Sequence, residues 1–171
     1  MINYKSAQKK NLKIPLGYTL IELLVTLTIV GLLFGFGFVS FRDFSRRQAL
    51  QGVIQNVKGD LRLAQSDALS GQIPIGCTAN LDGYSFYVVS QSEYQILANC
   101  GVSQILVKDV SLPSGITIDN SATPTVNPIM FKTLGQGTNI PASNVSTIIT
   151  LKQQNTTNSA TVTVTIGGQI Q

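Results

Sequence analysis

The sequence predicts an α+β protein in which a long N-terminal helix packs on an antiparallel β-sheet head. Three observations carry this prediction. A basic segment precedes an uncharged apolar run, a helical repeat of apolar residues continues after that run, and short β-branched runs separated by turn residues fill the rest of the chain. We expect four parts: a basic leader over 1–17, a membrane helix over 18–41, an amphipathic helix half over 42–71, and a β-rich globular head over 72–171.

The first half of the helix is predicted to cross a membrane. Leu23–Phe41 contains 19 residues without a charge, which is close to the shortest helix that spans a bilayer. Its glycines are tolerated in membrane helices, where they allow close helix contact. The leader holds four lysines and no acidic residue. Because lysines favour the cytoplasmic side, they orient the remainder of the chain outward.

The second half of the helix is predicted to be amphipathic. Apolar residues recur there at spacings of three and four, which places them on one face of a helix: Leu50, Val53, Ile54, Val57, Leu61, Ala64 and Ala68. We assign the polar surface to Arg42, Asp43, Arg46, Arg47, Lys58, Asp60, Arg62 and Asp67. Gly71 and Pro74 end the pattern. The sequence therefore predicts one nearly continuous helix from Tyr18 to Ser70.

The head is predicted to contain seven short strands separated by Gly, Pro, Asn and Asp. They are Tyr84–Ser90, Tyr94–Ala98, Gln104–Val110, Ile116–Ile118, Ile129–Phe131, Thr147–Leu151 and Thr161–Ile166. The last shows strict alternation, so we expect Val162, Val164 and Ile166 to face the core and the threonines to face outward.

Two cysteines, Cys77 and Cys100, lie in the part expected to be translocated. The 22 residues between them include two predicted strands. An oxidising compartment favours a disulfide, and two buried thiols are the alternative. With no histidine and no second cysteine pair, no metal site is expected.

Composition argues against an enzyme and against nucleic-acid binding. The chain has no histidine, the commonest general base. Asp82, Glu93, Asp109 and Asp119 form no recognisable pair of catalytic acids, and no cofactor is expected. The net charge of +4 comes from the leader, because the remaining residues hold eight basic and eight acidic side chains.

A short motif joins the leader to the apolar run: Gly17-Tyr18-Thr19-Leu20-Ile21-Glu22-Leu23. It resembles the signal of type IV prepilins, and the resemblance covers about residues 12–41. This implies cleavage after Gly17 by a prepilin peptidase and N-methylation of Tyr18, a position where Phe is commoner in the family. It also implies a pilin-like fold.

Glu22 is an ionisable residue at the start of an apolar segment, and such a residue needs a partner. After cleavage, the α-amine of Tyr18 lies one helical turn away, at the positive end of the helix dipole. Glu22 then pairs either with its own amine or with that of a neighbouring subunit. The family resemblance favours the second arrangement, which sets the axial offset of an incoming subunit.

A second, weaker resemblance points to H-type minor pseudopilins and FimT-like minor pilins. Gln65-Ser66-Asp67-Ala68 stands where those families often have Arg-Ser-Glu-Ala. The final residues resemble a Gly-Arg-x-Arg ending, but Gln169 and Gln171 replace the arginines that are thought to hold phosphate in DNA-uptake members. Without those charges, DNA binding loses its main driving term. A patch built from Lys108, Lys132 and Lys152 stays open as an alternative.

The resulting expectation is a non-enzymatic minor pilin or pseudopilin of a type IV pilus or a type II secretion pseudopilus. Its partners would be prepilin peptidase, other subunits, the inner-membrane assembly platform and lipid. Its N-terminus would be cytoplasmic and its head extracytoplasmic, with later incorporation into a filament. Two alternatives stay open: a major pilin that forms the bulk fibre, and a signal-anchored or secreted β domain with a binding role.

Overall fold

The computed structural model describes residues 17–119 and 125–171, and the side chains of 36–41 and 43 fall outside that description. The predicted leader therefore lies outside the described residues, apart from Gly17. The chain forms two compact units, 1–43 and 44–171.

One α-helix, α1 (Leu20–Ser70), begins two residues later than predicted and ends where predicted. The Thr19 hydroxyl accepts a hydrogen bond from the Glu22 N–H at 3.3 Å, which caps the helix start. At the other end Gly71 adopts a left-handed conformation with φ 64°. The Gly71 and Gln72 N–H groups then bond the carbonyls of Ala68 and Asp67. This pattern terminates helices and favours glycine at its left-handed position.

All seven residues of the predicted apolar face of α1 are buried, which confirms the amphipathic pattern. One residue of the predicted polar surface is also buried. Asp60 is only 8% exposed, so its assignment to the solvent face was wrong. The reason is a pair of polar contacts from the head, described below.

The head contains all seven predicted strands, most of them longer than predicted. They are β1 (Leu81–Ser90), β2 (Glu93–Cys100), β3 (Ser103–Ser111), β4 (Ile116–Ile118), β5 (Ile129–Lys132), β6 (Ser146–Gln153) and β7 (Ser159–Thr165), with a short 3-10 helix η1 (Thr133–Gly135) after β5. They form two antiparallel sheets, in agreement with the predicted antiparallel head. The first has the order β3-β2-β1-β5 and the second β4-β6-β7.

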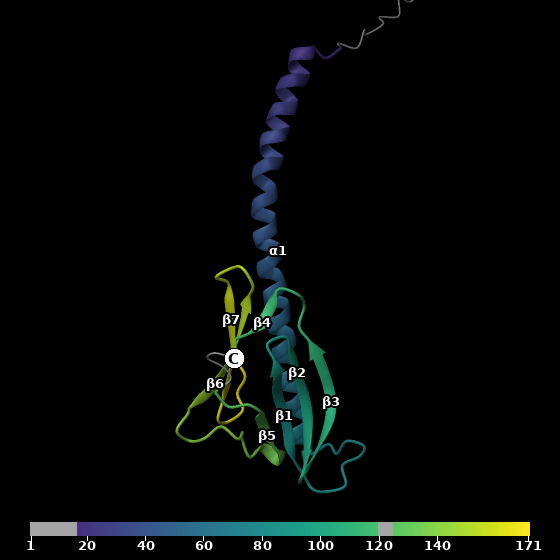
Figure 1. Cartoon of the computed structure of the whole chain (residues 1–171), viewed down its shortest axis with the longest axis vertical. Helices are drawn as coiled ribbons and strands as arrows, with labels where there is room; N and C mark the ends of the chain where they lie inside the picture. The colour runs from purple at the N-terminus through teal and green to yellow at the C-terminus, as the bar shows by residue number, and fades with distance from the viewer. Residues whose placement is uncertain (1–16, 120–124) are drawn as a thin grey trace, which may run out of the picture. The chain divides into compact units, whose positions relative to one another are not determined.

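A single hydrophobic core joins the apolar face of α1 to both sheets, and Figure 1 shows β1 and β2 running beside the lower part of α1. Val162 and Val164 are fully buried, as predicted. Ile166 is 41% exposed, so its predicted inward orientation was wrong. The alternation fails there because β7 ends at Thr165 and the chain turns through Gly167 and Gly168.

The structure does not confirm the membrane-spanning segment predicted over 18–41. The side chains of its last residues, 36–41, lie outside the description, and among the described residues no helix combines the length and the apolar character needed to cross a membrane.

We expect the packing of α1 to depend on its buried face. Replacing the fully buried Leu61 with alanine should lower the free energy of unfolding by about 2–5 kcal/mol, because it removes contacts and leaves a cavity. Leu63 on the same helix is 41% exposed, so Leu63→Ala serves as the matched control and should cost under about 1 kcal/mol. Urea denaturation followed by tyrosine fluorescence measures both values. Equal losses in the two variants would contradict the assigned helix face.

Candidate functional site

The predicted cleavage point lies in an open segment before α1. Gly17 and Tyr18 belong to no helix or strand. Tyr18 is 84% exposed, and no described atom lies within 4 Å of where a Cβ on Gly17 would be. Within the described residues, nothing therefore blocks access to the bond between Gly17 and Tyr18.

Glu22 lies in the first turn of α1, a place that favours a negative charge because of the helix dipole. Its backbone N–H takes part in the helix cap with Thr19. Its carboxylate makes no hydrogen bond or ion pair with any residue that the structure describes. The predicted partner, the Tyr18 α-amine, exists only after cleavage.

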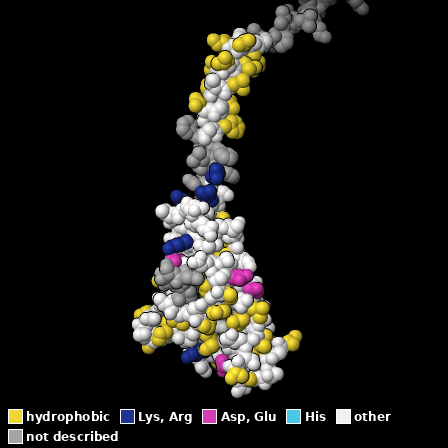
Figure 2. Space-filling view, in the orientation of Figure 1, with side chains coloured by type: hydrophobic (Ala, Val, Ile, Leu, Met, Phe, Trp, Pro, Cys, Tyr) yellow, Lys and Arg dark blue, Asp and Glu magenta, His cyan; other side chains and the backbone are white. Residues whose placement is uncertain are grey.

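The first four turns of α1 expose an unusually apolar surface, visible as the yellow band on the upper helix in Figure 2. Its large apolar side chains are all exposed: Leu20, Ile21, Leu23, Leu24, Val25, Leu27, Ile29, Val30, Leu32, Leu33 and Phe34. The two threonines within this stretch turn their hydroxyls back to the helix. Thr26 donates to the Leu23 carbonyl at 2.9 Å and Thr28 to the Val25 carbonyl at 2.8 Å. Burying this surface would therefore leave no threonine hydroxyl unpaired.

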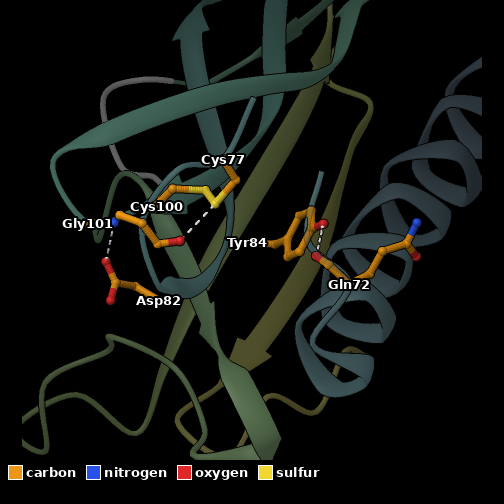
Figure 3. Close-up of a disulfide and its surroundings, with 7 residues drawn as sticks. Gln72, Cys77, Asp82, Tyr84, Cys100 and Gly101 are labelled. Carbon is orange, nitrogen blue, oxygen red and sulfur yellow. Dashed lines mark hydrogen bonds between the residues drawn. A yellow bond between two sulfur atoms is a disulfide. The ribbon is translucent and has the colours of Figure 1, made fainter. Parts of the chain in front are cut away.

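The predicted disulfide between Cys77 and Cys100 is present, with Cα atoms 5.7 Å apart. It ties the loop that follows α1 to the end of β2 (Figure 3). The Tyr84 hydroxyl donates to the Gln72 carbonyl at 2.6 Å and holds the start of the same loop. The chain that leaves the helix is thus attached to the first sheet at two points.

Asp60 is the main polar contact between α1 and the first sheet, and sequence reasoning missed it. Its carboxylate accepts hydrogen bonds from the Tyr94 hydroxyl at 2.8 Å and from the Lys108 ammonium at 2.6 Å. Tyr94 is fully buried and stacks on Phe86 with ring centroids 4.7 Å apart. The position of Asp60 in the sequence could have indicated its burial, because Asp60 lies next to Leu61 and three residues after Val57, at the edge of the apolar face.

Burial and the neighbouring carboxylate make Tyr94 hard to ionise. Desolvation raises the pKa of the Tyr94 hydroxyl far above its usual range, and the hydrogen bond to Asp60 and the negative charge of Asp60 raise it further. Burial also raises the pKa of Tyr84, with a smaller contribution from Asp67.

The C-terminal residues are held by backbone and side-chain contacts rather than by charges. The Gln65 amide donates to the Gly168 carbonyl at 2.9 Å, which ties the tail to α1. The Gln169 carbonyl accepts from the Thr165 N–H, and the Gln171 carbonyl accepts from the Thr163 N–H. The tail therefore lies along β7.

The three head lysines lie on three different strands, and two of them are in ion pairs. Lys108 pairs with Asp60, and Lys152 pairs with Asp119 at 2.5 Å. Lys132 is at the end of β5. This arrangement gives little support to the open alternative of a cationic patch. Among the described residues, no three acidic, cysteine or histidine side chains are grouped closely enough to hold a metal ion.

A helix whose later half packs on antiparallel sheets and whose first turns expose an apolar surface defines a pilin-like protein. The chain belongs to the family described as type II transport protein GspH, which matches residues 53–168. This match confirms the predicted resemblance to H-type pseudopilins, and it covers the packed part of α1 and nearly all of the head. No curated protein and no solved structure showed significant similarity to the chain.

The raised pKa of Tyr94 predicts alkaline instability of the head. The fold stabilises the protonated Tyr94 phenol, whose pKa in the unfolded chain is about 10. This contribution to the unfolding free energy is fully present below pH 10 and is lost as the pH rises above 10. Unfolding frees the phenol to ionise, so the unfolding free energy should fall by up to about 1.4 kcal/mol per pH unit above that point.

Thermal melts of the wild type and of Tyr94→Phe between about pH 8 and pH 11 measure this effect. The variant should be less stable at pH 8, because the Asp60 carboxylate loses a donor, and should show a flatter decline above pH 10. Tyr87→Phe, at an exposed tyrosine, is the control. Parallel declines in all three proteins would contradict the assignment.

Proposed function

We propose that this chain is a minor pseudopilin or minor pilin that is cleaved after Gly17, N-methylated on Tyr18, and assembled into a filament through the N-terminal part of α1. Membership of the GspH family supports a pseudopilin of type II secretion. The observation that carries the finer proposal is the exposed apolar surface from Leu20 to Phe34, preceded by Glu22 and an accessible Gly17.

An exposed apolar surface of this extent requires a partner, because contiguous apolar patches on monomeric proteins are usually small or functional. The threonine hydroxyls are already satisfied within the helix, so lipid or neighbouring helices can cover this surface without unpaired groups. We assign it two successive environments: the inner membrane before assembly, and the helices of other subunits afterwards. Prepilin peptidase and the inner-membrane assembly platform are the partners that these two stages require.

Glu22 is the one charged group in this surface, and it supports pairing with a Tyr18 amine. Two charges that each resist burial neutralise one another when paired, whereas one left alone is strongly unfavourable. Pairing between neighbouring subunits would select a single axial offset for each incoming subunit. The head would then be presented outside the cytoplasmic membrane, where the Cys77–Cys100 disulfide can persist.

A major pilin that forms the bulk fibre is the second candidate. The length of the chain and its neutral mature charge suit such a subunit, whereas the GspH match favours a minor one. Quantifying this protein against the other subunits of sheared filaments separates the two, because a major pilin would dominate them.

The first test is the intact mass and N-terminal sequence of the protein, expressed with and without a prepilin peptidase. A mature chain that begins at N-methylated Tyr18 only in the presence of the peptidase supports the proposal. A chain that still begins at Met1 indicates an ordinary signal anchor, and a start near Phe38 indicates a secreted domain. Both of these outcomes would refute the processing step.

Substitution of Gly17 should block maturation. Gly17→Ala places a side chain immediately before the scissile bond, where the prepilin pattern calls for glycine, so the full-length precursor should accumulate. The structure offers no steric reason for misfolding, because a Cβ there meets open space. Gly31→Ala, also in open space, should be processed normally. Immunoblotting of both variants gives the ratio of precursor to mature chain. A wild-type ratio for Gly17→Ala would contradict cleavage after Gly17.

Substitution of Glu22 should separate stability from assembly. Glu22→Leu removes the charge from an exposed helix position, so membrane-associated protein should stay at wild-type levels. Incorporation into sheared filaments should fall at least about tenfold, because the Tyr18 amine loses its partner. Glu93→Leu removes an acid from the head instead and should assemble normally. Equal incorporation of the wild type and Glu22→Leu would show that the charge pair is dispensable.

A further inference from the structure

A cavity of about 510 Å³ opens on the face of the first sheet opposite the hydrophobic core. Its residues on β2 and β5 alternate with core residues such as Ala98 and Phe131, which places them on the outer face. The cavity lies beside Cys100 of the disulfide, between the start of β1, the end of β2 and the turn that follows β5. It is lined by Leu81, Asp82, Asn99, Gly101, Met130, Lys132, Thr133 and Gln136.

A β-bulge positions the acidic side of this cavity. Pairing between β1 and β2 passes from Leu81–Cys100 directly to Gly83–Asn99, so Asp82 is the extra residue. Bulges redirect a side chain out of the regular alternation. The Asp82 Oδ2 atom accepts the Gly101 N–H at 3.0 Å, as Figure 3 shows, which fixes the carboxylate. Oδ1 accepts no hydrogen bond from any residue that the structure describes. Gly83 permits the local geometry, because a Cβ there would overlap the Phe131 carbonyl oxygen.

A turn with a left-handed backbone conformation positions the side of the cavity opposite Asp82. After Lys132, the chain passes through Leu134 with φ 55° and Gly135 with φ 74°. The Lys132 N–H closes this turn on the Gly137 carbonyl at 2.9 Å. A left-handed leucine whose side chain is 77% exposed is unfavourable, and such strain concentrates at ligand sites. The turn directs Thr133 and Gln136 to the cavity wall.

Three polar side chains that line the cavity have no polar partner in the part of the chain that the structure describes. Among the described residues, the side chains of Lys132, Thr133 and Gln136 make no hydrogen bond or ion pair. Lys132 and Asp82 do not pair with each other, although Lys132 lies opposite Gly83 in the sheet. Asn99 differs, because Ser85 and Gln104 hold its amide. The cavity thus presents one separated cation and one separated anion.

This geometry points to a binding site for a small zwitterion of the amino-acid or dipeptide type. Its ammonium group lies against the Asp82 carboxylate and its carboxylate against the Lys132 ammonium, with Thr133 and Gln136 contacting the atoms between them. Two opposite charges are better matched by a zwitterion than by a neutral sugar, since each charge then has a partner. The remaining lining from Leu81 and Met130 is aliphatic and offers no ring for a sugar to stack on.

The test uses the full chain in detergent micelles, titrated with glycylglycine and followed by amide chemical shifts. The two matched probes are N-acetylglycylglycine, which lacks the ammonium, and glycylglycinamide, which lacks the carboxylate. For a ligand of this size we expect saturation at up to about 20 mM glycylglycine, with shifts around Asp82, Gly101 and Gln136. The N-acetyl group and the C-terminal amide should each weaken binding roughly tenfold, because each removes one charged contact.

Two variants identify which end of the ligand each side chain holds. Lys132→Gln should weaken glycylglycine binding roughly tenfold and remove the preference over glycylglycinamide. Asp82→Asn retains an acceptor for the Gly101 N–H and should remove the preference over the acetylated probe. Lys152→Gln, at an ion-paired lysine of the second sheet, should bind as the wild type does. No binding of glycylglycine, or equal affinity for all three probes, would overturn the proposal, as would unchanged preferences in both variants.

Discussion

The buried face of α1 contains one carboxylate among seven apolar residues, and its contacts fix how the helix lies on the head. An apolar stripe alone tolerates small slides along a sheet, because burial is non-directional. Asp60 removes that freedom, since its two oxygens accept from Tyr94 on β2 and Lys108 on β3. A slide by one turn would leave a buried carboxylate and a buried phenol without partners, at a cost of several kcal/mol. The position of the first sheet relative to the helix follows from this contact.

Three of the four sheet edges, those at β3, β5 and β7, are modified in ways that oppose strand-to-strand association. On β3 the pairing with β2 passes from Lys108 to Leu106, so Val107 is a bulged residue beside an exposed lysine. Bulges and lysines are common means of protecting an edge. Beyond β7, Ile170 forms a bridge to Val164, and beyond β5, Thr138 forms one to Phe131. These three edges are poorly suited to pair with strands of another subunit, which supports the proposal that the apolar surface of α1 drives assembly.

The elements that the sequence predicted are those that depend on local patterns. Spacing of three and four identified the helix face, β-branched runs identified seven strands, and two cysteines in a domain expected to be translocated identified the disulfide. What failed depends on distant residues. Asp60 is buried because its carboxylate accepts a hydrogen bond from Tyr94. Tyr94 lies 34 residues away in the chain, so no local pattern reveals this contact. The number of sheets was not predicted, because the division depends on β5 pairing with β1 while β4 pairs with β6. The cavity lined by Asp82 depends on a β-bulge, and a bulge cannot be recognised from the periodicity of the sequence.

Under the proposed function, Glu22 differs from Asp60 in that its partner forms only when the chain is cleaved. The Tyr18 nitrogen belongs to a peptide bond before cleavage, so it carries no charge that could neutralise the carboxylate. Cutting after Gly17 creates a cation one helical turn from Glu22, and at the positive end of the helix dipole that cation is unfavourable unless a carboxylate is near. In the proposed mechanism, processing therefore does more than remove a leader. It creates the complementary charge, so only mature subunits can bury this part of the helix against one another without an unpaired carboxylate.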